Sequence, residues 1–348
     1  MAGWARALVL AERKRTPVTA ELTELDRRVA SALQVDGRAA PGRIAAVLGV
    51  SPRTAARSLA RLTPAVRVVR VPDRARLPEV TLLRVRVLRG RVEVLADALA
   101  RRPEVLFVDV LSGGEEISAV TLGGAPTLPT GQAVTSVRAH AVLHVFADAA
   151  DWRTGLLTAE EVAALTPPHL SSTHASALPA PAPDAHTPAL PALDAHTPDE
   201  LDERLIDLLT ADARTGPGAL AAALRTPEST VRRRLDRLAR SGLLRTCVVA
   251  DPRLFGLAVD ANVWMAVPPD RLPEFGARLA RDPLVHGVLA TTGATNLMAA
   301  VFCRDLAQLY RFVTGLTDIP SAEVTVVSGA VKRAGHRPTP YPLAHPRG

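Results

Sequence analysis

The sequence predicts an α+β protein in which one composite unit occurs twice. The unit is three short helices of the helix-turn-helix type, followed by an antiparallel sheet with helices on one face. Two observations lead to this prediction. Residues 25–62 align without a gap on residues 201–238, and 16 of the 38 aligned positions are identical. Beyond the aligned helices, strand-like and helix-like segments follow in nearly the same order in both halves. A repeat of this length determines the fold class, because each copy must fold as one unit.

The second copy shows the signals of three helices most clearly. Thr197 offers a capping hydroxyl and Glu200 follows three residues later, so the first helix is expected to begin here, with Pro198 in its first turn. Gly216-Pro217-Gly218 breaks that helix, and Thr226-Pro227 predicts the start of a third, arginine-rich helix. The apolar stripe of the first helix consists of Leu201, Leu205, Leu208 and Leu209.

The first copy repeats these signals. Thr23 and Asp26 have the spacing of a capping box, and Pro41-Gly42 precedes the short second helix. Gly49 supplies a residue that tolerates positive φ, and Ser51-Pro52 predicts the cap of the third helix. We therefore expect the same three-helix unit in both copies.

The segments after each helical unit predict the order β-α-β-β-α-β, the ferredoxin-like split βαβ arrangement. In the first copy, the Gly- and Pro-rich segment 123–133 stands where the second helix should be, so this copy is expected to lack that helix. The expected strands of the first copy are residues 66–71, 81–88, 105–111, 117–122 and 134–146, with a helix at 92–101. Those of the second copy are 243–249, 259–267, 285–292, 297–303 and 323–328, with helices at 272–281 and 305–316.

Seven consecutive regions follow from this organisation. Between the copies, residues 166–198 are rich in Pro, Ala, Ser, Thr and His and repeat DAHTP, which is typical of a linker. The predicted regions are a basic N-terminal arm (1–20), helix-turn-helix 1 (21–63), ferredoxin-like domain 1 without its second helix (64–150), a linker (151–197), helix-turn-helix 2 (198–245), ferredoxin-like domain 2 (246–334) and a tail (335–348).

Composition excludes several classes of protein. No stretch approaches the roughly 18 apolar residues of a membrane span, and the first residues are too charged for a signal peptide, so a cytoplasmic protein is expected. The net charge of +7 fits a nucleic-acid partner, although nearly all of it is arginine, which a GC-rich genome also favours. Cys247 and Cys303 have no metal-ligand spacing, and no catalytic triad, metalloprotease or phosphate-loop motif occurs. The sequence therefore predicts no catalytic residue, no metal and no cofactor.

A helix-turn-helix followed directly by a split βαβ domain resembles the Lrp/AsnC (feast/famine) family of transcriptional regulators, here in a tandem duplicated form. The first copy carries the resemblance at Leu25-Asp26, Asp36-Gly37-Arg38 and Gly49-Val50-Ser51. The second copy carries it at Gly242-Leu243-Leu244 and Asp251-Pro252. The resemblance implies winged helix-turn-helix domains joined to ferredoxin-like domains of the RAM type.

The resemblance also implies an effector-binding turn that begins at Thr292-Gly293, with Gly293 and Asn296 as the candidate residues. The family usually carries an acidic residue where this chain has Asn296, which leaves open whether the effector is an amino acid or another small metabolite. The alternative for Gly293 is an ordinary β-turn glycine. His286 and Cys303 lie on apolar strands and are expected in the core.

The third helix of each unit is the candidate DNA-reading element, whose first residues would reach base edges while later arginines meet phosphates. The alternative is a solvated basic face in an arginine-rich chain. The predicted DNA-binding residues are Arg53, Thr54, Arg57, Ser58 and Arg61 in the first copy, and Ser229, Thr230, Arg233, Arg234 and Arg237 in the second.

Together these features predict a sequence-specific, one-component transcriptional regulator that binds double-stranded DNA as an internal pseudo-dimer and associates further into homo-oligomers. Two different reading helices imply half-sites that do not form a perfect palindrome. Two other classes stay open at this point. One is a decarboxylase of the haem pathway (siroheme type), since some of these enzymes resemble the same architecture, and the other is a small-molecule-binding partner of another regulator.

Overall fold

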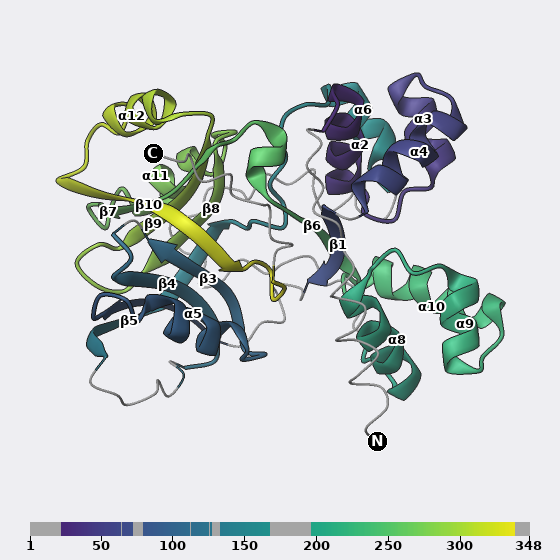
Figure 1. Ribbon diagram of the computed structural model, residues 1–348, viewed down its shortest axis with the longest axis horizontal. Helices are drawn as coiled ribbons and strands as arrows, with labels where there is room; N and C mark the ends of the chain where they lie inside the picture. Colours follow the sequence, from purple (N-terminus) through teal and green to yellow (C-terminus); the bar gives the residue numbers. More distant parts are fainter. Residues whose placement is uncertain are drawn as a thin grey trace.

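A computed structural model describes residues 22–63, 65–71, 79–111, 113–124, 126, 133–167 and 196–337. Two helical units lie on one side of the molecule, a closed β-structure lies on the other, and a two-stranded ribbon lies between them (Figure 1). The predicted fold class, a helix-turn-helix plus a ferredoxin-like sheet duplicated in one chain, is confirmed. The predicted arm, the first DAHTP repeat and the first two residues of the second repeat lie outside the described residues.

The first helical unit consists of α2 (Glu24–Val35), α3 (Pro41–Leu48) and α4 (Pro52–Leu62). The predicted capping box is confirmed, because Asp26 N donates to Thr23 Oγ1 at 3.1 Å and Thr23 N donates back to Asp26 Oδ2 at 3.2 Å. Ser51 caps α4 by accepting from Thr54 N at 3.1 Å. Gly49 ends α3 in the left-handed conformation, with φ of 67°. Capping side chains thus set both helix starts where the sequence predicts them.

The second helical unit consists of α8 (Glu200–Ala211), α9 (Pro217–Leu224) and α10 (Glu228–Arg240). The predicted cap of α8 at Thr197 is wrong. The cap is Asp199, whose carboxylate accepts from Asp202 N at 2.9 Å, so Thr197 and Pro198 both precede the helix. The reason is that Asp199 and Asp202 form the same reciprocal box as their counterparts in the first copy.

The turn before α10 also differs from expectation. Thr226 donates its hydroxyl to Leu224 O at 3.2 Å, so α10 has no side-chain cap. Arg225, which stands where the first copy has Gly49, takes the same left-handed conformation with φ of 53°. The backbone path of the turn is therefore preserved, at the cost of some strain for a residue with a Cβ.

Strands β1 (Val66–Val71) and β6 (Arg245–Ala250) follow the two helical units and pair with each other across the copies. The ladder is antiparallel and runs from Val66 opposite Ala250 to Val71 opposite Arg245. This ribbon joins the two halves of the chain, with α2 packed against β6 and α8 against β1.

The two ferredoxin-like sheets close into one eight-stranded barrel. The first sheet contains β2 (Val80–Val87), β3 (Val105–Leu111), β4 (Glu116–Leu122) and β5 (Val134–Ala147). The second contains β7 (Val259–Ala266), β8 (Val285–Thr291), β9 (Leu297–Cys303) and β10 (Ser321–Lys332). The order within each sheet is that of a split βαβ fold, and the sheets join where β5 pairs with β8 and β10 with β3. Strand β10 serves both sheets, since residues 321–326 pair with β7 and residues 327–332 with β3.

Three helices cover the sheets: α5 (Val92–Ala100), α11 (Leu272–Leu279) and α12 (Leu306–Thr314). The described residues between β4 and β5 contain no helix, so the first sheet has no counterpart of α12. On β5, Val137 and Leu143 are correspondingly exposed, at 45% and 64%. A short 3₁₀ turn, η2 (Pro252–Phe255), connects β6 to β7.

The linker prediction is wrong for residues 151–167, which include helix α6 (Ala159–Leu165). Thr158 and Glu161 form its capping box, and Leu165 is fully buried in the core of the first helical unit. Arg43 Nη2 donates to Ala164 O at 2.9 Å. The segment is ordered because it supplies apolar surface and hydrogen bonds to α2 and α3.

Candidate nucleic-acid interface

The outward faces of α4 and α10 hold six of the predicted DNA contacts: Arg53, Thr54, Arg57, Ser229, Thr230 and Arg233. The two threonines are half-buried, and the other four side chains are exposed. Within the described part of the chain, no carboxylate pairs with Arg53, Arg57 or Arg233. These guanidinium groups are therefore available to phosphates and base edges.

Two predicted contacts face inward, and their assignment is corrected here. Ser58 is fully buried, and its hydroxyl donates to the Asp26 carboxylate. At the equivalent position of the second copy, Arg234 Nη1 donates to Asp202 Oδ1 at 2.8 Å. Ser58 shares the buried stripe of α4 with Ala55, three residues earlier, so this position faces the core.

Arg61 and Arg237 have a structural partner as well. Arg61 Nη2 lies 2.7 Å from Asp26 Oδ1, and Arg237 Nη2 lies 2.9 Å from Asp202 Oδ2. Both arginines keep 40–50% of the side chain exposed, with values of 48% and 41%. Each of these guanidinium groups is thus held by the carboxylate of the first helix of its own unit, and its role at DNA stays a prediction.

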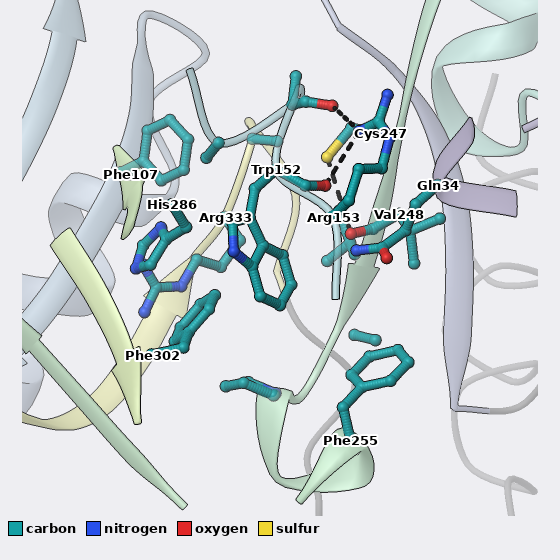
Figure 2. A pocket seen from close by; sticks show the side chains of 16 residues that line it. Gln34, Phe107, Trp152, Arg153, Cys247, Val248, Phe255, His286, Phe302 and Arg333 are labelled. Atoms are coloured by element: carbon teal, nitrogen blue, oxygen red, sulfur yellow. Dashed lines mark hydrogen bonds between the residues drawn. The ribbon is translucent and has the colours of Figure 1, made fainter. Parts of the chain in front are cut away.

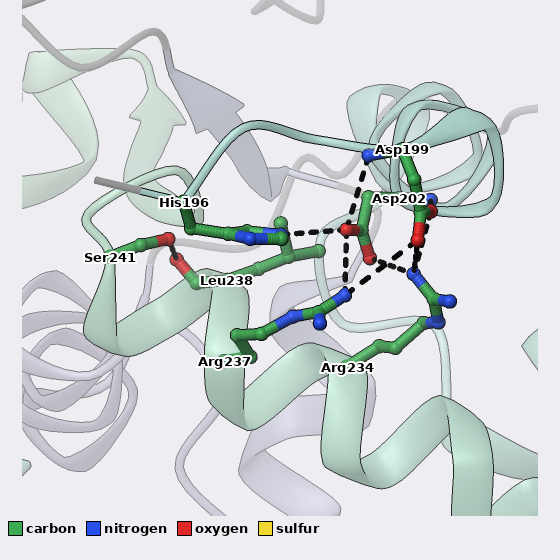
Figure 3. Close-up of polar contacts among 7 residues, drawn as sticks. All are labelled: His196, Asp199, Asp202, Arg234, Arg237, Leu238 and Ser241. Carbon is green, nitrogen blue, oxygen red and sulfur yellow. Dashed lines mark hydrogen bonds and ion pairs between the residues drawn. The ribbon is translucent and has the colours of Figure 1, made fainter. Parts of the chain in front are cut away.

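The carboxylates of Asp26 and Asp202 lie under α4 and α10 and anchor each of these recognition helices to the first helix of its own unit. Figure 3 shows Asp202 between Arg234, Arg237 and His196, whose Nε2 lies 2.7 Å from the carboxylate. Burial alone would raise the pKa of Asp26, but hydrogen bonds from Arg61, Ser58 and Thr23 lower it to about 2. For Asp202 the pKa is likewise lowered, against the effect of burial, by hydrogen bonds from Arg234 and His196.

The two reading faces differ in charge. Glu228 occupies the first turn of α10, where α4 has Pro52, and it pairs with Arg232 Nη2 at 2.5 Å. Glu228 and Arg232 were not among the predicted DNA-binding residues, although the acidic residue at the start of the helix was a visible signal. A carboxylate at this place can accept a hydrogen bond from cytosine N4, which an arginine cannot do.

The helical units hold each other through a reciprocal pair of arginines. Arg38 donates to Ala213 O and, at 3.3 Å, to Thr215 O. Arg214, its equivalent in the second copy, donates to Gly37 O at 2.7 Å and to Ala39 O at 3.1 Å. We call these four bonds the arginine clasp. Each guanidinium thus satisfies carbonyl groups in the turn of the other copy, as expected around a pseudo-twofold axis.

The ribbon adds to the clasp. Ala213 N donates to Val68 O of β1 at 3.0 Å, and Gly37 leaves no room for a side chain, since a Cβ there would lie 2.5 Å from Thr246 Oγ1. The clasp and the ribbon therefore fix the separation and angle of the two reading helices. The sequence did contain a signal, because Arg38 and Arg214 are identical in the alignment.

The expected effector turn has a structural role in this molecule. Asn296 Oδ1 accepts from Val267 N at 2.8 Å and its Nδ2 donates to Val267 O at 2.8 Å, so the backbone of β7's end holds the amide in place. Gly293 has φ of 106°, and a Cβ there would lie 2.6 Å from His140 Nδ1 on β5. The role of Asn296 as an effector contact stays a prediction, while Gly293 is required by the packing of the second copy against the first.

Other predicted features can be placed. His286 and Cys303 are buried, as expected for strand residues. The described residues contain no cluster of three or more His, Cys, Asp or Glu side chains arranged to hold a metal ion. In the same part of the chain, every helix is too short or too polar to cross a lipid bilayer.

Comparison with known proteins agrees with this geometry. Residues 22–63 and 199–239 match the AsnC-type helix-turn-helix domain, and residues 260–339 match the Lrp/AsnC ligand binding domain. An uncharacterized HTH-type transcriptional regulator of Pyrococcus abyssi is 30% identical over 143 residues, which cover 40% of this chain and 90% of the relative. The HTH-type transcriptional regulator LrpA of the same organism is 25% identical over 135 residues, 38% of this chain and 91% of the relative.

Among solved structures, the siroheme decarboxylase NirDL aligns with a TM-score of 0.51 and 14% identity over 89% of this chain and 93% of its own. At this identity the likeness extends to the duplicated fold alone. Fold, interface and relatives together define a DNA-binding transcriptional regulator of the helix-turn-helix class. The chain belongs to the Lrp/AsnC family.

Proposed function

We propose that both recognition helices of this regulator contact one operator, so that a single chain does the work of a dimer. The observation that carries the proposal is the arginine clasp together with the cross-copy ribbon, which present Arg57 and Arg233 on equivalent faces at a fixed separation. A pseudo-twofold pair of recognition helices suits two half-sites spaced by whole turns of B-DNA.

The two halves of the operator are proposed to differ. The first reading face carries Arg53 and Arg57, whereas the second carries the Glu228–Arg232 pair beside Arg233. Because these side chains have different hydrogen-bonding chemistry, the half-sites should not be related by a perfect palindrome. Arginine to guanine is the commonest specific contact, so the first half-site is expected to be the more guanine-rich on the contacted strand.

The test is binding of the purified chain to DNA from upstream of its own gene, measured across a salt series. Arg57→Ala and Arg233→Ala should each weaken specific binding by about 10-fold or more, as expected for loss of a contact to base or phosphate. Arg281→Ala, an exposed arginine beyond α11 on the barrel, is the matched control and should bind as the parent does. Loss with only one of the two variants would contradict the use of both copies.

We further propose that the chain regulates transcription without catalysis, senses a small metabolite, and self-associates beyond the internal pseudo-dimer. The relatives are regulators, and a ligand binding domain model matches the second copy. Sedimentation measures the self-association directly. Incubation with siroheme distinguishes the decarboxylase alternative, since release of carbon dioxide would contradict the proposal.

A further inference from the structure

A cavity of about 70 Å³ lies between the barrel, the β1–β6 ribbon and the first helical unit. Its walls come from α2 at Gln34, from β6 at Cys247, from β9 at Phe302, and from residues 149–153 after β5 (Figure 2). Both copies and both kinds of domain therefore contribute to one space. The turn at Gly293 is not among the lining residues.

One wall of the cavity is aromatic. His286 stacks on Phe302 with ring centres 3.7 Å apart and an interplanar angle of 14°, and Trp152 meets Phe302 edge-on at 5.0 Å. Trp152 Nε1 donates to Pro283 O at 3.0 Å, which fixes the indole. A preformed apolar wall with few polar groups is the usual lining of a small-molecule site.

Two arginines line the cavity, and only one of them has its charge compensated. Arg333 pairs with Asp260 and, at 3.2 Å, with Asp109. Arg153 has no ion pair within the described residues. Its Nη1 donates to Ala150 O at 3.1 Å and to Trp152 O at 2.9 Å, which leaves Nε and Nη2 without a protein acceptor there.

The neighbours of Arg153 do not supply the missing negative charge. Asp148 and Asp151 both pair with Arg245, which lies 3.9 Å and 2.7 Å from them. The Cys247 thiol stays neutral at physiological pH, because burial raises its pKa to about 12. Burial lowers the pKa of Arg153, and the charge of Asp151, which is paired with Arg245, offsets this effect only in part.

We infer that this cavity binds a small carboxylic acid with an apolar body, whose carboxylate accepts from Arg153 while its hydrocarbon part lies along the aromatic wall. A planar guanidinium with two free N–H groups matches a carboxylate in bidentate fashion. A water needs roughly 10–15 Å³ of such space, so the cavity suits a ligand of about five to seven non-hydrogen atoms. Branched short-chain acids such as 3-methylbutanoate have this size.

The position of the cavity gives such a ligand a regulatory consequence, which rests on the proposed function. A ligand held there touches the barrel through Phe302, the ribbon through Cys247 and the first helical unit through Gln34. Binding would therefore favour the arrangement in which these parts are closed against one another, the arrangement that also sets the spacing of the reading helices. The carboxylate should change affinity for the operator and, reciprocally, the operator should change affinity for the carboxylate.

The experiment is calorimetric titration of the full-length chain, without DNA, with 3-methylbutanoate and with its uncharged amide. Quenching of tryptophan fluorescence is the second readout, because Trp152 lines the cavity and the Trp152→Phe variant should lose the signal. A ligand of this size is expected to bind with a Kd of about 0.1–1 mM. The amide should bind about 10-fold more weakly or worse.

Three variants separate binding from folding. Arg153→Gln removes the charge and Ala149→Leu fills the cavity at a residue outside the apolar cores, so both should weaken binding of the acid about 10-fold or more. Arg43→Gln is the matched control, since Arg43 also donates to two main-chain carbonyls but lies outside the cavity. Equal affinity of acid and amide, or unchanged affinity in both cavity variants, would overturn the inference. Because no DNA is present, an unsuccessful operator search leaves this result standing.

Discussion

Breaking the arginine clasp should uncouple the two reading helices without damaging either. The perturbation is Arg38→Met and Arg214→Met, alone and together. These substitutions keep an unbranched, flexible side chain and remove the donors to the turn of the other copy. Arg43→Met is the control, because Arg43 donates to two carbonyls within the first copy only.

The magnitude follows from the bonds that are lost. A hydrogen bond to a charged group contributes about 1.5–3 kcal/mol net. We count one such bond for each arginine, because the second bond of Arg38, to Thr215 O at 3.3 Å, is long. Each substitution should then shift the equilibrium between docked and separated helical units by roughly 10- to 150-fold. The ribbon still tethers the two units, so the effect on DNA affinity should be the smaller part of this range.

The assay compares an operator that carries both half-sites with DNA that carries one. Each single variant should bind the complete operator about 10-fold more weakly, and the double variant more weakly still, while affinity for a single half-site changes less than about twofold. Full affinity of the double variant for the complete operator would refute the reasoning, and the ribbon alone would then set the spacing. Equal losses on both DNAs would show damage to the helical units themselves.

Three further predictions concern single positions. Asp202→Asn should lower the free energy of unfolding of the second helical unit by about 1–3 kcal/mol, measured by hydrogen exchange in α10, because the charge-assisted hydrogen bonds from Arg234 and from the half-exposed Arg237 are weakened. The pKa of Asp26 is lowered to about 2, so the stability that its ionised carboxylate contributes is present above pH 3.8 and is lost as the pH falls towards about 2. Acid titration of the first helical unit should therefore show a loss of about 1–2 kcal/mol in the free energy of unfolding. We expect the lower end of this range, because Arg61 is half exposed. Glu228→Gln should strengthen binding to random DNA and weaken discrimination at the second half-site; unchanged discrimination would show that this carboxylate does not face a base.

Local signals in the sequence determined most of the fold. Capping residues, Pro-Gly turns and apolar stripes act over a few residues, so the helical units and the order of strands were predictable, and the alignment of the copies supported both. Partners across the copies were not predictable in this way. The residues of Val66–Val71 do not identify Arg245–Ala250 as the partner strand, because strand pairing depends on the whole three-dimensional arrangement.

The candidate site was predicted in part for a similar reason. Arg53, Arg57 and Arg233 lie on the outward face, as helical periodicity requires. Ser58 and Arg234 were placed on the groove side by their position along the third helix, yet each meets a buried carboxylate from the first helix of its own unit. The identical pair Asp26 and Asp202 was the signal, since a buried acid needs donors and the nearest element is the recognition helix. The cavity beside Arg153 left no trace in the sequence, because its walls come from seven separate segments.

Because β10 pairs with both β7 and β3, it also determines when the barrel can close during synthesis. A chain leaves the ribosome from its N-terminus, so the first sheet emerges with β3 and β5 as open edges long before β8 and β10 exist. Exposed strand edges are templates for pairing with other chains. The barrel closes only once residues 327–332 have been synthesised and have reached β3. A nascent chain stalled between the two copies should therefore be much more prone to aggregation than one stalled after Lys332, and the linker region is where chaperone protection would matter most.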